Sequence, residues 1–170
     1  YNPKIDKDIA VNYSVEDVIK AKAANKTALQ KELGLEENPD AFMLGIVSRL
    51  TDQKGLDLVE CVLDQICAED VQLVVLGTGE GKYQDMFTYY SRKYPERVSA
   101  NIFYSEALSH RIYASCDAFL MPSLFEPCGL SQLMSLRYGT LPIVRETGGL
   151  RDTVTPYNEV DGTGTGIFIY

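Results

Sequence analysis

Short apolar runs alternate along the chain with segments of helical periodicity. Six of these runs predict buried strands, because they are apolar on both faces and are bounded by turn residues. They are Phe42–Val47, Val71–Leu76, Val98–Tyr104, Ala118–Met121, Leu141–Val144 and Ile167–Ile169.

Helices are predicted between the strands. The first begins with the capping-box-like Ser14–Asp17 and ends at Leu33, before Gly34. Its predicted apolar face contains Val15, Val18, Ile19, Leu29 and Leu33. The second follows Gly55, with an apolar stripe of Leu56, Val59, Leu63 and Ile66. Two more are expected, from about Lys82 to Tyr94 and at Ser109–Ser115.

The alternation of strands with helices predicts the fold class. We expect an α/β fold, a Rossmann-like parallel sheet of at least five strands with helices on both faces. At 170 residues the chain is long enough for one domain with a substantial core, and we expect residues 1–170 to form a single domain.

Composition and charge narrow the classes of partner. Hydrophobic residues make up 45% of the chain and charged residues 24%, as in ordinary globular proteins. The formal net charge of −8 argues against non-specific nucleic-acid binding, which needs a basic surface. No apolar run approaches the roughly 20 residues of a membrane span, and the start has no signal-peptide pattern. We therefore expect a cytoplasmic protein without nucleic-acid or membrane partners.

The cysteines and the single histidine give no metal motif. Cys61, Cys67, Cys116 and Cys128 form no C-x-x-C pair, and His110 cannot complete a zinc site at usable spacing. We expect reduced, mostly buried thiols, a structural His110, and neither metal nor cofactor.

The most informative stretch is Phe125–Gly139, which reads F-E-P-C-G-L-S-Q-L-M-S-L-R-Y-G. It follows the strand Ala118–Met121 and leads through a Pro-Cys-Gly turn into a helical pattern. Glu126 is therefore expected at the carboxyl end of a strand, just ahead of a helix start, where free N–H groups and the helix dipole point outward. Ligands of open α/β sheets bind at such positions, so a phosphate or a group of sugar hydroxyls is expected here.

Two other strand ends carry candidate residues. Arg49 and Lys54 follow the strand Phe42–Val47 across a turn, and two cations in an acidic chain favour an anion site, although solvated loop cations are the alternative. The loop Gly77–Lys82 follows the next strand but matches neither a dinucleotide fingerprint nor a Walker A loop. Backbone contact of Gly77 with a ligand and a plain strand-to-helix turn remain equal alternatives.

These motifs resemble a known family. Pro122–Val154 and the block S-R-L-T-D-Q-K-G at Ser48–Gly55 resemble bacterial glycogen synthases and plant starch synthases, which are retaining glucosyltransferases of the two-domain GT-B architecture. The resemblance extends from Tyr1 to Gly166. It implies that the chain is the donor-binding, C-terminal half of a GT-B fold. Because the chain begins Tyr-Asn-Pro and stops at an apolar strand, we expect it to be truncated at both ends.

The resemblance also implies roles for individual residues. Arg49 and Lys54 would grip the diphosphate of the sugar donor, and Glu126 would contact the glucose and support positive charge at its anomeric carbon. Tyr104, in Y-S-E-A-L-S-H-R, would contact the adenine. Backbone N–H groups would reach the sugar hydroxyls and the phosphates from Cys128, Gly129, Leu130 and Ser131. Met134 stands where the wider GT-B group has a second acid, which favours the glycogen synthase branch.

The activity implied is transfer of glucose from ADP-glucose to the non-reducing end of an α-1,4-glucan, with retention. The rest of the cleft would come from an N-terminal domain of the same protein. We therefore expect this chain alone to bind the donor but to be inactive. The alternatives are a non-catalytic nucleotide-sugar binding module and another GT-B glycosyltransferase.

Overall fold

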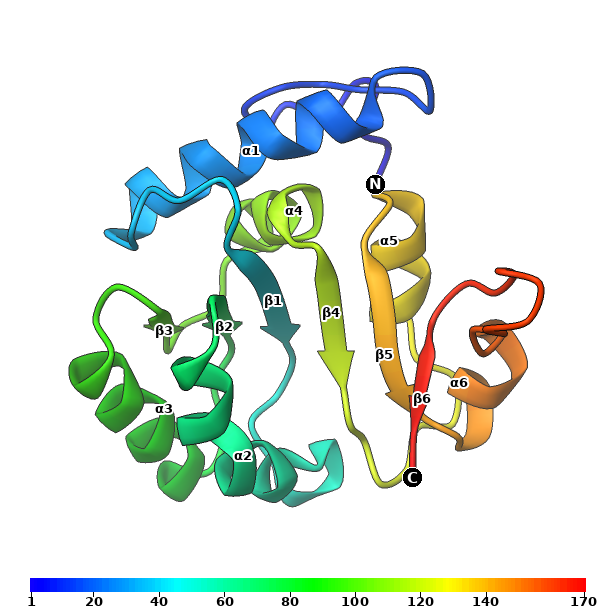
Figure 1. Cartoon of the computed structure of the whole chain (residues 1–170). Coiled ribbons are helices and arrows are strands. Elements are labelled where there is room, and N and C mark those ends of the chain that lie inside the picture. Colours follow the sequence, from blue (N-terminus) through cyan, green and yellow to red (C-terminus); the bar gives the residue numbers. More distant parts are fainter.

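The computed structural model describes residues 1–170 and contains one six-stranded parallel sheet with helices on both faces (Figure 1). The strand order is β3-β2-β1-β4-β5-β6. The predicted fold class, Rossmann-like α/β, is therefore confirmed. The strands are β1 (Phe42–Val47), β2 (Val71–Leu76), β3 (Val98–Asn101), β4 (Ala118–Met121), β5 (Leu141–Arg145) and β6 (Ile167–Ile169).

Two groups of helices cover the two faces of the sheet. The helices are α1 (Val18–Leu33), η1 (Asp52–Lys54), α2 (Leu56–Ala68), α3 (Gly81–Lys93), α4 (Glu106–Ser115), α5 (Ser131–Arg137) and α6 (Gly148–Thr153). One core cluster joins α2 and α3 to the sheet. On the opposite face α1, α4, α5 and α6 pack through two further clusters. Alternate strand residues point to opposite faces, so apolar strands bury both.

The order of the strands decides which loops lie next to one another. From β1 the chain adds strands on one side of the sheet up to β3, and from β4 it adds them on the other side, so the strand order reverses between β1 and β4. These two strands pair in parallel through Leu44 with Ala118 and Gly45 with Phe119. The carboxyl ends of all six strands lie at one edge, at the bottom of Figure 1. Open α/β sheets bind ligands in the crevice at such a reversal. The fold therefore gathers the loops that follow β1, β2 and β4 around one crevice.

The helix predicted at Ser109–Ser115 begins three residues earlier, at Glu106. The third strand is shorter than predicted. Sequence predicted Val98–Tyr104, whereas β3 ends at Asn101. The Asn101 carbonyl accepts the last bond from the sheet, from the N–H of Gly77 (3.1 Å). Phe103 and Tyr104 then leave the sheet, with 48% and 86% of their surfaces exposed. Tyr104 thus lies in a loop before α4, not at a strand end.

The predicted apolar face of the first helix is confirmed in part. Leu29 is buried, and Val18 and Leu33 pack partly buried against the core. Val15 precedes α1, and Val15 and Ile19 are 87% and 86% exposed, so the prediction is wrong for these two.

The helix also buries polar residues. Lys26 pairs with Asp117 at 2.6 Å, and the side-chain amide of Gln30 donates to the Oε1 of Gln72 at 2.8 Å. Buried polar groups are tolerated when they are bonded, and these partners lie far along the chain.

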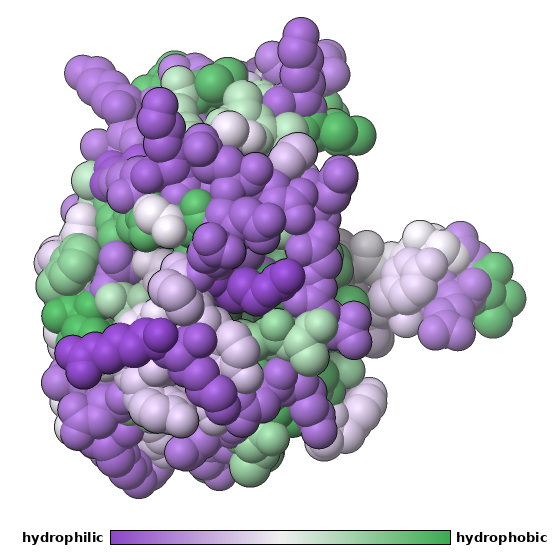
Figure 2. Space-filling view, turned by 60° about the vertical axis from the view of Figure 1, so that its left-hand side comes forward, coloured by the Kyte–Doolittle hydropathy of each residue, from purple (hydrophilic) through white to green (hydrophobic).

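The surface agrees with the acidic, polar composition. Figure 2 shows a face on which hydrophilic residues predominate and hydrophobic ones lie in small separate areas. None of the helices has the length and apolar character needed to cross a membrane. All four cysteines are free, but only Cys67 and Cys116 are buried while Cys61 and Cys128 are exposed. The expectation of mostly buried thiols therefore holds for two of the four.

Candidate functional site

Two adjoining cavities lie at the carboxyl edge of the sheet. The larger, of about 320 Å³, extends from the ends of β1 and β2 to the helices α4 and α5. The smaller, of about 70 Å³, lies between the ends of β1 and β4. Both are lined by Val47, Ser48 and Ser131, so they adjoin at the predicted crevice, and the two together are called the hollow.

Lys54, which lines the smaller cavity, forms an ion pair with Glu126. The Nζ of Lys54 lies 2.8 Å from Oε2 of Glu126, and the two side chains are 15% and 12% exposed. Ser123, which is buried, donates its hydroxyl to the same carboxylate oxygen at 3.2 Å. The fold thus joins residues from η1 and from the loop after β4, 72 positions apart. Lys54 is therefore not the solvated loop cation that sequence left as an alternative.

The backbone around Glu126 is held from two sides. On one side, the side-chain amide of Gln53 donates to the carbonyl of Phe125 at 3.0 Å. On the other, the N–H of Gly149 donates to the carbonyl of Glu126 at 2.9 Å. A Cβ on Gly149 would lie 2.0 Å from the Cys128 carbonyl oxygen, so only glycine allows this approach. The Gly148-Gly149 turn, expected to serve close packing, does so against the loop that carries Glu126.

The predicted contacts after Glu126 divide into two groups. Ser131, the first residue of α5, lines both cavities. Cys128, Gly129 and Leu130 line neither, and Leu130 is 61% exposed. The carbonyls of Cys128 and Gly129 each accept a 3.0 Å bond from the side chain of Gln132. This bonding orients the loop, and the contacts of these three residues with a ligand stay predictions.

The larger cavity collects the remaining predicted residues. Arg49, Gly77 and Tyr104 line it from three different loops. Arg49 is exposed and forms no ion pair, so its charge is available to an anion. A Cβ on Gly77 would lie 1.9 Å from the carbonyl oxygen of Ser48, so glycine lets the two strand ends approach.

Sequence reasoning missed several residues in and around this hollow. Ser123 and Gln53 support Glu126, and Tyr1 and Glu106 line the larger cavity. Ser123 stands three residues before Glu126 and Gln53 directly before Lys54, so proximity to the motifs was an available signal. Nothing in the spacing of Tyr1 indicated that the start of the chain reaches this cavity.

The arrangement suits an anionic ligand that also carries polar hydroxyls. Arg49 and Lys54 are cations at the ends of one loop, and Arg presents a planar fork to phosphate oxygens. Glu126 lines neither cavity, but its carboxylate is paired with Lys54, which lines the smaller one.

Comparison with known proteins decides the family. The sequence pattern of the family described as "Glycosyl transferases group 1" matches residues 26–169, which is most of the chain. The chain belongs to this family. The sequence-based resemblance to a group of glycosyltransferases is thereby confirmed.

Among group 1 glycosyltransferases, this chain is similar in sequence to glycogen synthases. It is 71% identical over 166 residues to a glycogen synthase of Lachnospira eligens and 66% identical to one of Lachnoclostridium phytofermentans. These alignments cover 98% of this chain but 35% of each relative. The chain thus spans about a third of the length of the curated relatives it matches.

Solved structures give the same likeness in three dimensions. The catalytic domain of starch synthase IV from Arabidopsis thaliana, bound to ADP and acarbose, superposes with a TM-score of 0.86 at 36% identity. The match covers 94% of this chain and 33% of that one. A sucrose-phosphate synthase from Thermosynechococcus elongatus, 22% identical with a TM-score of 0.64, shares the fold.

Proposed function

We propose that this chain is the donor-binding half of a glycogen or starch synthase. The whole enzyme transfers glucose from ADP-glucose to the non-reducing end of an α-1,4-glucan, with retention of configuration. The observation that carries the proposal is the Lys54–Glu126 pair at the strand reversal, beside the cavity that Arg49, Gly77 and Tyr104 line. The glycogen synthases at 71% and 66% identity and the ADP-bound starch synthase support it.

The proposed donor pose follows the hollow. The nucleobase and ribose occupy the larger cavity, with the base against Tyr104, and the diphosphate lies between Arg49, Lys54 and the start of α5. The glucose then reaches Glu126 and the backbone of Cys128 and Gly129. In this pose different residues contact the nucleobase and the glucose of the donor.

The proposed reaction needs both cationic and anionic groups in the site. As the bond to the anomeric carbon breaks, the leaving diphosphate gains negative charge, which Arg49 and Lys54 stabilise in place. Positive charge grows at the anomeric carbon, and the Glu126 carboxylate stabilises it. Lys54 already neutralises Glu126 in the ligand-free chain, so donor binding places the phosphate where it shares that cation.

The acceptor and the rest of the cleft are assigned to an N-terminal domain of the same protein. The chain covers only about a third of its relatives, which leaves room for such a domain in a protein of their length. The free thiols fit a reducing compartment such as the cytoplasm.

One experiment tests the function directly. The full-length enzyme is incubated with glycogen and radiolabelled ADP-glucose, and label in precipitated glucan is counted. We expect label to be incorporated into the glucan. Treatment of that glucan with a debranching enzyme and an exo-acting α-1,4-glucosidase should release the label again. Donor binding without any transfer would instead favour a non-catalytic nucleotide-sugar module, and transfer to a different acceptor another GT-B activity.

A further inference from the structure

The start of the chain forms part of the larger cavity. Tyr1 lines it together with Tyr104 and Glu106, although 103 positions separate Tyr1 from Tyr104. Tyr1 as a residue is 46% exposed, so the protein covers it only in part. A partly covered aromatic residue that lines a cavity can present its ring to a flat ligand.

The ring of Tyr1 is held in place by His110. The two rings are stacked, with centroids 4.1 Å apart and planes 22° from parallel. Tyr113 and Tyr138 meet the Tyr1 ring edge-on at 6.3 and 6.4 Å. Stacked and edge-to-face pairs are the favoured arrangements of aromatic rings. Tyr1 therefore has a defined orientation in the cavity.

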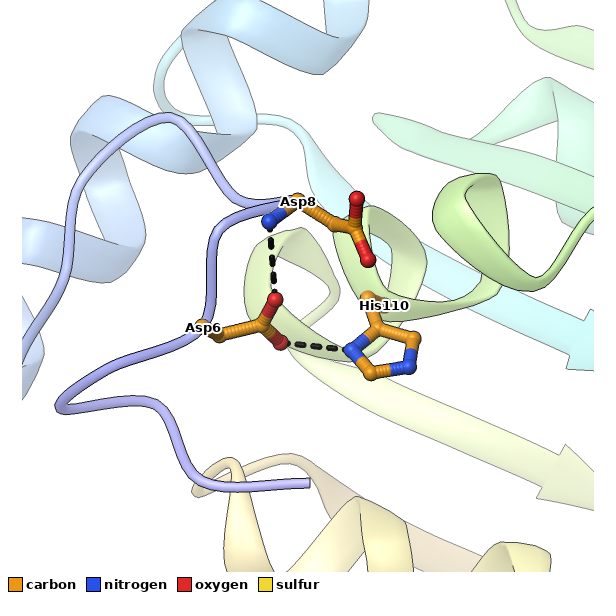
Figure 3. Close-up of side chains that lie close together, drawn as sticks. All are labelled: Asp6, Asp8 and His110. Atoms are coloured by element: carbon orange, nitrogen blue, oxygen red, sulfur yellow. Dashed lines mark hydrogen bonds and ion pairs between the residues drawn. The ribbon is translucent and has the colours of Figure 1, made fainter.

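His110 is itself fixed by a buried carboxylate. Its Nδ1 lies 2.6 Å from Oδ2 of Asp6, which also accepts a bond from the hydroxyl of Tyr138. The other oxygen of Asp6 accepts the N–H of Asp8 at 2.9 Å (Figure 3). Burial raises the pKa of the Asp6 carboxyl, but the bonds from Tyr138 and His110 outweigh it and leave the pKa below its ordinary value.

This cluster is better explained as a support than as a metal site. Ligand atoms of Asp6, Asp8 and His110 lie within 4.8 Å of one another. However, both oxygens of Asp6 and the Nδ1 of His110 are already engaged with one another or with Tyr138 and Asp8. A metal ion would have to break these bonds. Asp6 instead bonds His110, and the His110 ring stacks on the ring of Tyr1.

We propose that Tyr1 is a second nucleobase-contacting residue of the donor site, and that His110 and Asp6 are positioning residues that hold its ring. The inference rests on the proposed function, because it assumes a nucleotide in the larger cavity. It adds that affinity for the nucleoside end of the donor depends on the segment before α1. The sugar end, at Glu126, is served by different residues.

The test uses the full-length enzyme with Tyr1→Leu, Tyr1→Phe and, as a surface control, Tyr89→Leu. Tyr89 lies on α3, is 57% exposed and lines neither cavity. Loss of one base–aromatic contact should raise Kd for ADP and KM for ADP-glucose about tenfold in Tyr1→Leu, with kcat nearly unchanged. Tyr1→Phe keeps the ring and should stay within about twofold of wild type, as should Tyr89→Leu.

The positioning role is tested by a double-mutant cycle. His110→Phe keeps an aromatic ring but loses the bond to Asp6, and it should raise Kd for ADP severalfold. That effect should vanish when His110→Phe is combined with Tyr1→Leu, because there is no ring left to position. A merely structural His110 would instead lower the Tm and leave the two effects on Kd additive.

Each outcome has one meaning. Wild-type enzyme that fails to bind ADP contradicts the proposed function itself. Wild-type enzyme that binds ADP while Tyr1→Leu matches it in Kd and KM contradicts only this inference. A fall in kcat with unchanged KM in Tyr1→Leu would also overturn it, since Tyr1 would then act on the chemical step.

Discussion

Lys54 and Glu126 form their ion pair with side chains that are largely withdrawn from water. This changes the prediction for the two cations. In the full-length enzyme, Arg49→Ala and Lys54→Ala should each cost roughly 2–4 kcal/mol of transition-state stabilisation, measured from kcat/KM. Only Lys54→Ala should also lower the free energy of unfolding, by about 1.5–3 kcal/mol, because it leaves a buried carboxylate unpaired. Arg92→Ala, an exposed cation on α3, serves as the control.

A combination with Glu126→Gln checks the cause of that stability loss. If the unpaired carboxylate is responsible, Lys54→Ala should cost far less stability in the Glu126→Gln background than in wild type. Near wild-type kinetics in both Arg49→Ala and Lys54→Ala would count against a diphosphate role.

The charge of Glu126 should matter more to turnover than to donor binding. Glu126→Gln keeps the shape and most hydrogen bonding, but it removes the charge that favours the positive anomeric centre formed as the bond breaks. We expect kcat to fall by about 10²–10³ with a much smaller rise in Kd for the donor. Measurement of kcat, Kd and Tm on one protein decides the matter. A normal kcat with a lowered Tm would leave Glu126 as a structural residue only.

At the scale of elements, the short helix α6 acts as a support for the loop that carries Glu126. Gly149→Ala would press a methyl group against the Cys128 carbonyl, and the loop and helix must separate. We expect a loss of about 1–3 kcal/mol in the free energy of unfolding and a marked fall in transfer activity. Gly81→Ala is the matched control, because a Cβ there meets nothing within 4 Å. Equal behaviour of the two variants in urea unfolding would refute the support role.

The first helix gives a second contrast between predicted and observed packing. Leu29 is 2% exposed, so Leu29→Ala should cost about 2–5 kcal/mol of stability. Ile19 is 86% exposed, so Ile19→Ser should change it by less than about 0.5 kcal/mol. Urea unfolding of both variants measures the difference. A large loss from Ile19→Ser would show that Ile19 is packed, as predicted from sequence.

These elements also show what sequence can predict here. Strands such as β1 and β2 were predicted with their observed bounds, because a strand buried on both faces is a continuous apolar run. The polar part of the inner face of α1 could not be predicted, because Lys26 and Gln30 become tolerable inside only through Asp117 and Gln72, which approach after folding. In the site, motifs indicated Glu126 and Lys54 separately. Their contact depends on the neighbouring positions of β1 and β4 in the sheet.

At the scale of the whole molecule, the hollow contains residues proposed to bind the sugar donor, whereas the proposed reaction also needs residues that bind the acceptor. The chain provides the proposed donor residues at one sheet edge, and no surface for the acceptor has been assigned to it. In the proposed enzyme, water exclusion and the acceptor come from a facing domain. Without it, charge developing on the diphosphate and the sugar would be stabilised by solvent rather than by fixed groups.

We therefore predict that the 170-residue chain alone does not synthesise glucan. It is incubated with glycogen and radiolabelled ADP-glucose, beside the full-length enzyme at equal concentration, and label in precipitated glucan is counted. ADP binding is measured on the same preparation by calorimetry, so that a folded, ligand-binding chain is distinguished from an inactive, misfolded one. Bound ADP with no incorporation is the expected result, because the proposed donor residues lie within this chain whereas the proposed transfer needs a second domain. Extension of glycogen by the chain alone would show that its single sheet edge suffices for catalysis, and the acceptor surface would then have to be sought beside Glu126.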